Sequence, residues 1–310
     1  MLRRTLSNRR LAACVLLALF TVGVARAEEP APLRAPPGLG PMGLASQSPF
    51  PALRLTLEPR DVSPLRRGEW SARLLTTWVN VWNIDRSSAV DAGRFTLDYE
   101  FLRSAVRVSR KLTEGVTVEG DLEIRSRFGG AMDSIIDEWH ELFGIGDRGR
   151  ESVPRHRFVF DIEGRDGSTT ISLPSSARGI YSRSLQGTVQ HDLRRRRRRG
   201  PAVGYAVTAR LELDNDATGD ESVDLGASLY VSQALKTSVF RANFGWSAFG
   251  DDDLAGLDLR STQGLLVLGY EWRYMRRQSI VAQYLAAEGA VSGISPYSRT
   301  THEYSCLLYT

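Results

Sequence analysis

Cysteine is scarce in this chain, and so are long apolar runs. The 310 residues contain two cysteines, Cys14 and Cys306. Cys14 lies in an N-terminal segment with the layout of a cleavable leader, so the remaining chain keeps one cysteine and can form no intrachain disulfide. Outside the leader no stretch reaches the ~18 apolar residues that suggest a spanning helix. A soluble β protein and a membrane β-barrel both remain open.

Residues 1–27 predict a secretory signal peptide. Four arginines precede an apolar run over residues 11–25, and Ala25-Arg26-Ala27 supplies small residues ahead of a cleavage site. The leader holds five arginines and no acidic residue, so the formal net charge of +4 becomes 4 − 5 = −1 for the rest of the chain. The basic pI therefore gives no reason to expect a nucleic-acid partner, and we expect none.

Residues 28–67 are rich in proline and glycine, which predicts an N-terminal arm that is partly ordered at best. From residue 68 onward, apolar and polar side chains alternate in many segments. A period of two predicts β-strands with one apolar and one polar face. The predicted strands are residues 69–83, 94–112, 116–125, 156–164, 168–173, 181–193, 202–213, 223–234, 238–249, 260–275, 278–288 and 301–309.

The connections between these strands alternate in length. Residues 214–222 and 250–259 are long and acidic, whereas the turns near residues 235–237 and 275–277 are tight. Outer-membrane barrels have short turns on the periplasmic side, long loops outside, and strands of ~10 residues with apolar side chains outward. An even count of about 12 strands also places both ends of the strand region on the short-turn side.

The sequence therefore predicts an all-β fold: a transmembrane antiparallel β-barrel of about 12 strands over residues 68–310, in the cell outer membrane. A soluble periplasmic β-sandwich binding protein is the alternative. In the barrel, charged side chains of one strand would face a wet lumen or plug it. These charged residues are Glu119, Asp121, Glu123 and Arg125.

A different period interrupts the strands at residues 132–143. Apolar side chains recur there at helical spacing, which predicts a short amphipathic helix in a loop. Its opposite face carries Asp133, Asp137, His140 and Glu141. Carboxylates and an imidazole on one face could bind a divalent cation or act as an acid–base pair, and a solvated helix face is the simpler interpretation. Position 144 is glycine, so a His-Glu-x-x-His zinc motif is absent.

The same stretch resembles an uncharacterised family of Gram-negative bacterial proteins, catalogued as domain of unknown function 3187 and presumed to be outer-membrane barrels. The resemblance is carried by Gly129, Gly130, Asp133, His140, Phe143 and Gly144. It implies a barrel fold and an outer-membrane location. It implies no reaction, because the family has no established activity.

No catalytic or cofactor-binding residue follows from the sequence, and no cofactor is expected. The expected function is a passive pore for small solutes or an envelope structural role. The expected partners are outer-membrane lipid and the barrel-assembly machinery, and the expected state is a monomer. The alternative is an outer-membrane hydrolase acting on lipid, in which a serine would pair with His191. The stretch from Gly245 to Phe249 lacks the last glycine of a Gly-x-Ser-x-Gly elbow.

Overall fold

The fold is known from a computed structural model, which describes residues 40–44, 46, 50, 54–84, 94–144, 154, 156–163, 170–173, 178–194, 200–215, 222–250, 253–254, 257–275, 278–292 and 297–309. The predicted signal peptide lies outside these residues. Each predicted strand is present, and the predicted helix begins one residue later than expected. No helix in the described ranges has the length and apolar character needed to cross a bilayer.

The elements follow one another along the chain as strands, with one helix between the third and fourth. They are β1 (Trp70–Ile84), β2 (Arg94–Lys111), β3 (Val116–Phe128), α2 (Asp133–Phe143), β4 (Val159–Glu163), β5 (Thr170–Ser172), β6 (Gly179–Arg194), β7 (Ala202–Asn215), β8 (Val223–Leu235), β9 (Ser238–Ala248), β10 (Asp253–Leu254), β11 (Leu257–Asp258), β12 (Thr262–Arg273), β13 (Ser279–Ala287) and β14 (Thr301–Tyr309).

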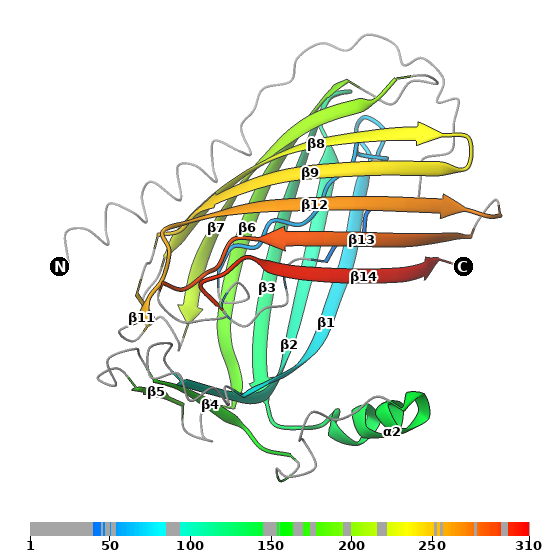
Figure 1. The fold of residues 1–310 in the computed structure, drawn as a ribbon. Coiled ribbons are helices and arrows are strands. Elements are labelled where there is room, and N and C mark those ends of the chain that lie inside the picture. The colour runs from blue at the N-terminus through cyan, green and yellow to red at the C-terminus, as the bar shows by residue number, and fades with distance from the viewer. Residues whose placement is uncertain are drawn as a thin grey trace, which may run out of the picture.

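Twelve strands form one antiparallel sheet, and ten of them make a strongly curled wall in the order β14-β13-β12-β9-β8-β7-β6-β3-β2-β1 (Figure 1). The other two, β4 and β5, are short. β4 pairs with Arg94–Asp98 of β2, beyond the point where β3 stops pairing at Phe128. The predicted count of about 12 therefore describes the sheet, whereas the wall has ten strands because β4 and β5 extend only one end of it.

β1 and β14 are the two edges of the wall. The register pairs Trp70 with Arg110 and Ser279 with Tyr309, so the start of β1 and the end of β14 lie at the end with the short turns. The short turns are residues 112–115, 236–237 and 274–278. Among the described strands, β1 does not pair with β14. The predicted all-β antiparallel barrel-type sheet is confirmed, in the form of a curled half-barrel.

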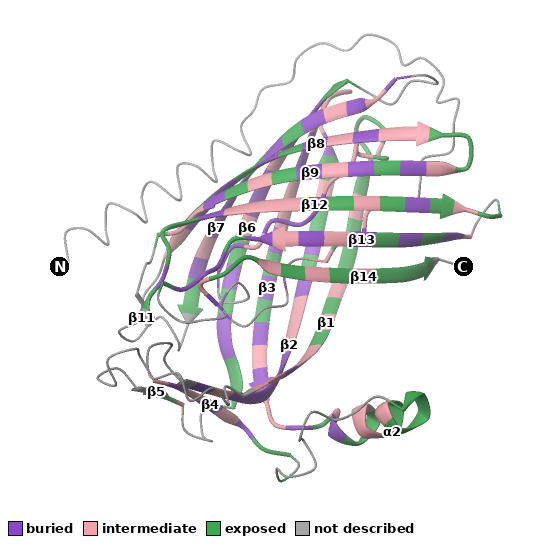
Figure 2. Cartoon of the chain, in the orientation of Figure 1, coloured by how far each residue is buried: buried purple, intermediate pink, exposed green. Residues whose placement is uncertain are grey.

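The wall exposes apolar side chains on its outer face and buries polar ones on its inner face. In β3, Leu122 and Ile124 are exposed, whereas Asp121, Glu123 and Arg125 are buried. Figure 2 shows the resulting stripes along the strands. A sandwich would bury its apolar face against a second sheet. The sandwich fold of the alternative is therefore wrong, because one sheet forms the wall and many of the side chains buried on its inner face are charged.

An apolar cluster covers the inner face at the long-loop end. It comprises Phe50, Val81, Phe95, Leu97, Tyr99, Phe101, Phe158, Phe160, Ile162, Tyr181, Leu259, Ala290, Val291 and Tyr297. The ring of Tyr297 lies 4.7 Å from that of Phe50 and 5.1 Å from that of Phe95, centroid to centroid. Asn83 Nδ2 donates a hydrogen bond to the Tyr297 hydroxyl at 2.8 Å, and burial raises the pKa of that hydroxyl. The cluster joins β2, β4 and the connection after β13.

Candidate functional site: the inner face and the segment that crosses it

A segment without regular secondary structure, residues 54–63, lies against the inner face of the wall; it is part of the blue trace in Figure 1. We call it the inner segment. Pro59 lies within it and Pro64 follows it, and proline lacks the backbone N–H that a strand ladder needs. Leu55 and Leu57 are nevertheless buried. The arm predicted to be partly ordered at best therefore contains a stretch that side-chain contacts fix in place.

Two wall glycines accommodate the leucines of the inner segment. A Cβ placed on Gly226 of β8 would lie 2.7 Å from Leu57 Cδ2, and one on Gly245 of β9 would lie 3.0 Å from Leu57 Cδ1. The backbone N–H of Leu55 donates to Asp224 Oδ2 at 2.8 Å. The wall is thus shaped to receive this segment, because side chains at either glycine would occupy the space that Leu57 fills.

Glu58 binds two arginines of β2. Its Oε2 lies 2.7 Å from Arg107 Nη1, and its Oε1 lies 3.2 Å from Arg103 Nη2. Both arginines also pair with carboxylates of β3: Arg103 Nε lies 2.5 Å from Glu123 Oε2, and Arg107 Nε lies 2.8 Å from Asp121 Oδ1. Glu119 Oε1 also lies 3.5 Å from Arg107 Nε, so Glu58 adds a fourth carboxylate to the three that β3 supplies.

The next two charges of the inner segment reach different parts of the wall. Arg60 Nη2 lies 2.9 Å from Glu119 Oε1 of β3. Asp61 accepts hydrogen bonds from Arg241 Nε of β9 at 2.8 Å and from Ser232 Oγ of β8 at 2.7 Å. In the sheet, β6 and β7 separate β3 from β8. The inner segment therefore bridges the interior from one side of the curl to the other.

Further ion pairs on the inner face join residues of the wall to one another. Lys111 Nζ lies 2.5 Å from Asp192 Oδ2, and the Tyr230 hydroxyl donates to Asp192 Oδ1 at 2.6 Å. Arg241 Nη2 lies 2.7 Å from Glu271 Oε2. Arg210 pairs with Glu212 and Asp224. Burying a charge is costly unless an opposite charge and hydrogen bonds accompany it, which these pairings provide.

The four groups predicted to face the lumen do point inward, but each is held in an ion pair: the three carboxylates are bound by arginines, and Arg125 is bound by Glu123. Glu119 contacts Arg60, Asp121 contacts Arg107, Glu123 contacts Arg103, and Arg125 Nε lies 2.6 Å from Glu123 Oε1. The interior is therefore filled by a charged network at this level, and of the two options in the sequence, the plugged lumen describes it better.

The acidic face of α2 does not assemble as a metal site. Asp133 is buried and its Oδ2 accepts a hydrogen bond from the backbone N–H of His156 at 2.8 Å, whereas Glu141 is exposed. Within the described residues, no three His, Cys, Asp or Glu side chains lie close enough together to hold a metal ion. Asp133 is thus bound to the backbone at His156, and among the described residues it forms no ligand group with Asp137, His140 and Glu141.

Several residues of the family signature build the junction at which α2 begins and ends. A Cβ on Gly129 would lie 2.6 Å from the Arg157 carbonyl oxygen, and one on Gly130 would lie 2.5 Å from His156 Cα. Gly144 adopts a φ of 63° and ends the helix by donating its N–H to the Glu141 carbonyl. Only glycine permits these close approaches and this backbone conformation, so the signature has a structural reason.

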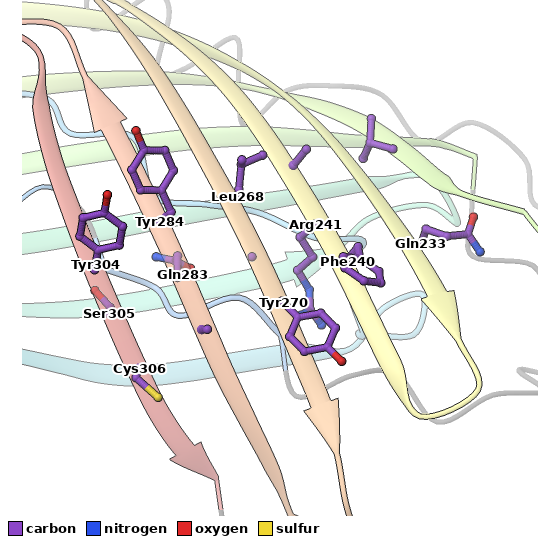
Figure 3. A pocket seen from close by; sticks show the side chains of 14 residues that line it. Gln233, Phe240, Arg241, Leu268, Tyr270, Gln283, Tyr284, Tyr304, Ser305 and Cys306 are labelled. Carbon is purple, nitrogen blue, oxygen red and sulfur yellow. The ribbon is translucent and has the colours of Figure 1, made fainter.

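On the outer face, a shallow hollow of about 700 Å³ crosses β8, β9, β12, β13 and β14 (Figure 3). Aromatic rings of Phe240, Tyr270, Tyr284 and Tyr304 surround it. Small side chains at Ala242 and Ala282 leave the space between the rings. The hollow is part of the apolar outer face and lies opposite the charged network.

Sequence reasoning missed the inner segment as a site. A signal was present, because Glu58, Arg60 and Asp61 form a charged stretch in an arm dominated by proline, glycine and alanine. Their partners are far away in the sequence: Arg241 lies 180 residues beyond Asp61. Spacing alone could not pair them.

Comparisons with known proteins agree with the resemblance seen in the sequence. No curated protein is similar enough in sequence to count as a relative. Among solved structures, the toluene transporter TbuX of Ralstonia pickettii is 10% identical, with 73% of this chain and 68% of that chain covered and a TM-score of 0.36. The toluene transporter TodX of P. putida is 13% identical, with 78% and 69% covered and a TM-score of 0.38. A family model matches residues 21–306, and the chain therefore belongs to the family described as "Protein of unknown function (DUF3187)".

Proposed function

We propose that this protein is inserted in the outer membrane, with the apolar outer face of the wall in contact with lipid. Soluble monomers rarely expose apolar patches above a few hundred Å². Here the exposed apolar side chains run across neighbouring wall strands. They include Val106, Val108, Leu122, Ile124, Leu185, Val207, Leu225, Leu229, Phe240, Phe244, Trp246, Leu268, Trp272 and Ile280. Each such side chain moved from water into hydrocarbon contributes roughly 1.5–3 kcal/mol.

Within that membrane protein, we propose a passage for small polar solutes that the inner segment closes. The observation that carries this proposal is the set of ion pairs made by Glu58 and Asp61. Their arginine partners lie on β2 and β9. Held by these arginines, the inner segment lies across the interior of the wall. Ion pairs can be exchanged for water or for a charged solute, so the closure is reversible.

The test is single-channel conductance in planar lipid bilayers. Wild-type protein is expected to conduct rarely. The double variant Glu58→Arg/Asp61→Arg places cations against Arg103, Arg107 and Arg241, and two unit charges 4 Å apart repel by about 4 kcal/mol at an effective dielectric constant of ~20. The inner segment should leave the wall, and open time should rise at least tenfold.

The matched control is Arg183→Glu. Arg183 pairs with Asp214 at 2.8 Å, but both side chains are half exposed and lie away from the inner segment. This variant should conduct like wild type. If the double variant folds and inserts yet conducts no more than wild type, the passage is refuted, and an envelope structural role becomes the better account.

The hydrolase alternative has less support. His191 Nδ1 lies 3.2 Å from the Tyr205 hydroxyl, and His302 Nδ1 lies 2.7 Å from the Tyr284 hydroxyl. A lipid hydrolase needs a nucleophile beside its general base. Both histidines have a tyrosine hydroxyl as their neighbour. The serine expected to pair with His191 therefore stays a prediction from the sequence.

A further inference from the structure

The helix α2 turns its apolar side away from the protein. Trp139 is 56% exposed and Leu142 is 74% exposed, and Ile135 and Phe143 are exposed beside them. The rings of Trp139 and Phe143 lie 4.5 Å apart, centroid to centroid, so they form one surface. Around the opposite side of the helix lie Asp137 and Glu141. An amphipathic helix normally buries its apolar stripe against the protein core, and here no described residue covers it.

The attachment point of α2 lies on the outer face of the wall. Glu100 alternates with the inward residue Phe101, and its carboxylate accepts hydrogen bonds from Trp78 Nε1 at 2.8 Å and from the backbone N–H of Met132 at 2.6 Å. The ring of Trp78, itself exposed, lies 5.9 Å from that of Phe128. Glu100 thus holds the start of the helix beside two aromatic rings that belong to the lipid-facing side.

The position along the strands agrees with a membrane surface. Phe128 ends β3 at the long-loop end of the wall, and α2 follows it after a short link, projecting sideways from the strand ends in Figure 1. The helix has 11 residues, about 16 Å in length at 1.5 Å per residue, which is too short to cross a bilayer. Tryptophan side chains favour the interface between hydrocarbon and headgroups.

We propose that α2 lies along the outer surface of the membrane, with Ile135, Trp139, Leu142 and Phe143 inserted among the lipid acyl chains. This inference rests on the membrane placement proposed above, and its partner is the lipid surface. The apolar stripe continues the outer face of the wall through Trp78, so one lipid surface covers both. Because the polar side is acidic, apolar burial rather than attraction to anionic headgroups supplies the binding. Contact should therefore persist in purely zwitterionic lipid.

The test uses spin labels on single cysteines in phosphatidylcholine vesicles. Leu142→Cys and Glu141→Cys are made with Cys14 and Cys306 both changed to serine, which gives one label on the apolar side of α2 and one on the polar side. Collision rates with oxygen, which enters lipid, are compared with those of a nickel chelate, which stays in water. At position 142 the collision rate with oxygen should exceed that with the chelate several-fold, and at position 141 the order should reverse.

A third labelled protein separates this inference from the membrane placement itself. Cys306 is exposed on β14 and reports on the wall when only Cys14 is changed to serine. If the label at Cys306 is in lipid and that at position 142 is in water, α2 does not lie in the membrane and the inference is overturned. If the labels at Cys306 and at position 142 are both in water, the proposed placement of the wall in the membrane is itself wrong. A label at position 142 that neither reagent reaches indicates contact with another protein surface, including a second copy, and also overturns the inference.

Discussion

At the scale of single residues, the inner face depends on charges that have little access to water. Lys111 is one of only two lysines in the chain and is fully buried against Asp192. Removing one partner of a buried pair leaves the other charge uncompensated, which costs about 3–5 kcal/mol. Exposed pairs contribute about 0–1 kcal/mol, because water already stabilises their charges.

The first prediction compares a buried and an exposed ion pair. Lys111→Met should lower the free energy of unfolding in lipid vesicles by about 3–5 kcal/mol, because Asp192 is left buried with the Tyr230 hydroxyl and without a cation. Arg183→Met, which removes a half-exposed pair with Asp214, should change it by less than about 1 kcal/mol. Urea titration followed by tryptophan fluorescence measures both. Equal losses for the two variants would show that burial does not govern these pairs.

The second prediction compares two inward glycines of the wall. A Cβ at Gly204 would lie 2.1 Å from the Tyr230 hydroxyl oxygen and 2.6 Å from the His191 carbonyl oxygen, whereas one at Gly269 meets only Arg241 Cβ at 3.6 Å. Gly204→Ala should therefore lower stability by about 1–3 kcal/mol through overpacking. Gly269→Ala should be neutral or slightly stabilising, because glycine weakens a strand interior. The same urea titration measures the free energy of unfolding of both variants. An unchanged free energy for Gly204→Ala would contradict the packing described around Tyr230.

Residue-level patterns in the sequence predicted which side chains share a face, but not what each one binds. The alternation in residues 116–125 placed Asp121 and Glu123 on the side opposite Leu122, as found. Their arginine partners depend on strand register. Register is set by turns and packing, and a slip of one residue would reverse every face.

At the scale of elements, the long wall strands were predictable from the sequence, whereas the short strands β4 and β5 and the inner segment were less so. The period of two located β8 within one residue, because alternation continues until the chain turns at residues 236–237. The length of β4 and β5 was not predictable from alternation, since five-residue and three-residue strands pair locally without entering the wall. The inner segment has no period at all, and side chains from five wall strands, β2, β3, β6, β8 and β9, position it.

The third prediction concerns the two ends of the wall. A protease site inserted in the connection between β7 and β8, residues 216–222, should be cleaved on intact cells. The same site inserted in the turn between β8 and β9, residues 236–237, should be cleaved only after the outer membrane is permeabilised, because short turns face the periplasm in outer-membrane barrels. If intact cells are cleaved only at the site in residues 236–237, the protein has the opposite orientation in the membrane and the prediction is wrong.

At the scale of the whole molecule, two physical requirements act together. Lipid on the outside demands apolar side chains and a hydrogen-bonded backbone, and the curled antiparallel sheet satisfies both except along its two edges, β1 and β14, which do not pair with each other among the described strands. The charged interior then needs counter-charges, and the inner segment supplies Glu58, Arg60 and Asp61 where the wall carries arginines and Glu119. The apolar outer face was predictable from the alternation in the sequence. The pairing of interior charges with the inner segment becomes visible only in the folded structure.

Refolding with and without lipid tests most directly whether the apolar outer face of the wall contacts a membrane. Protein unfolded in urea is diluted into buffer or into phosphatidylcholine vesicles, and unheated samples are compared with boiled ones on a denaturing gel. Lipid-dependent folding predicts a shifted, heat-sensitive band and a β-sheet circular dichroism spectrum only when vesicles are present. A soluble, folded monomer in buffer alone would contradict the claim that the apolar face of the wall contacts a membrane.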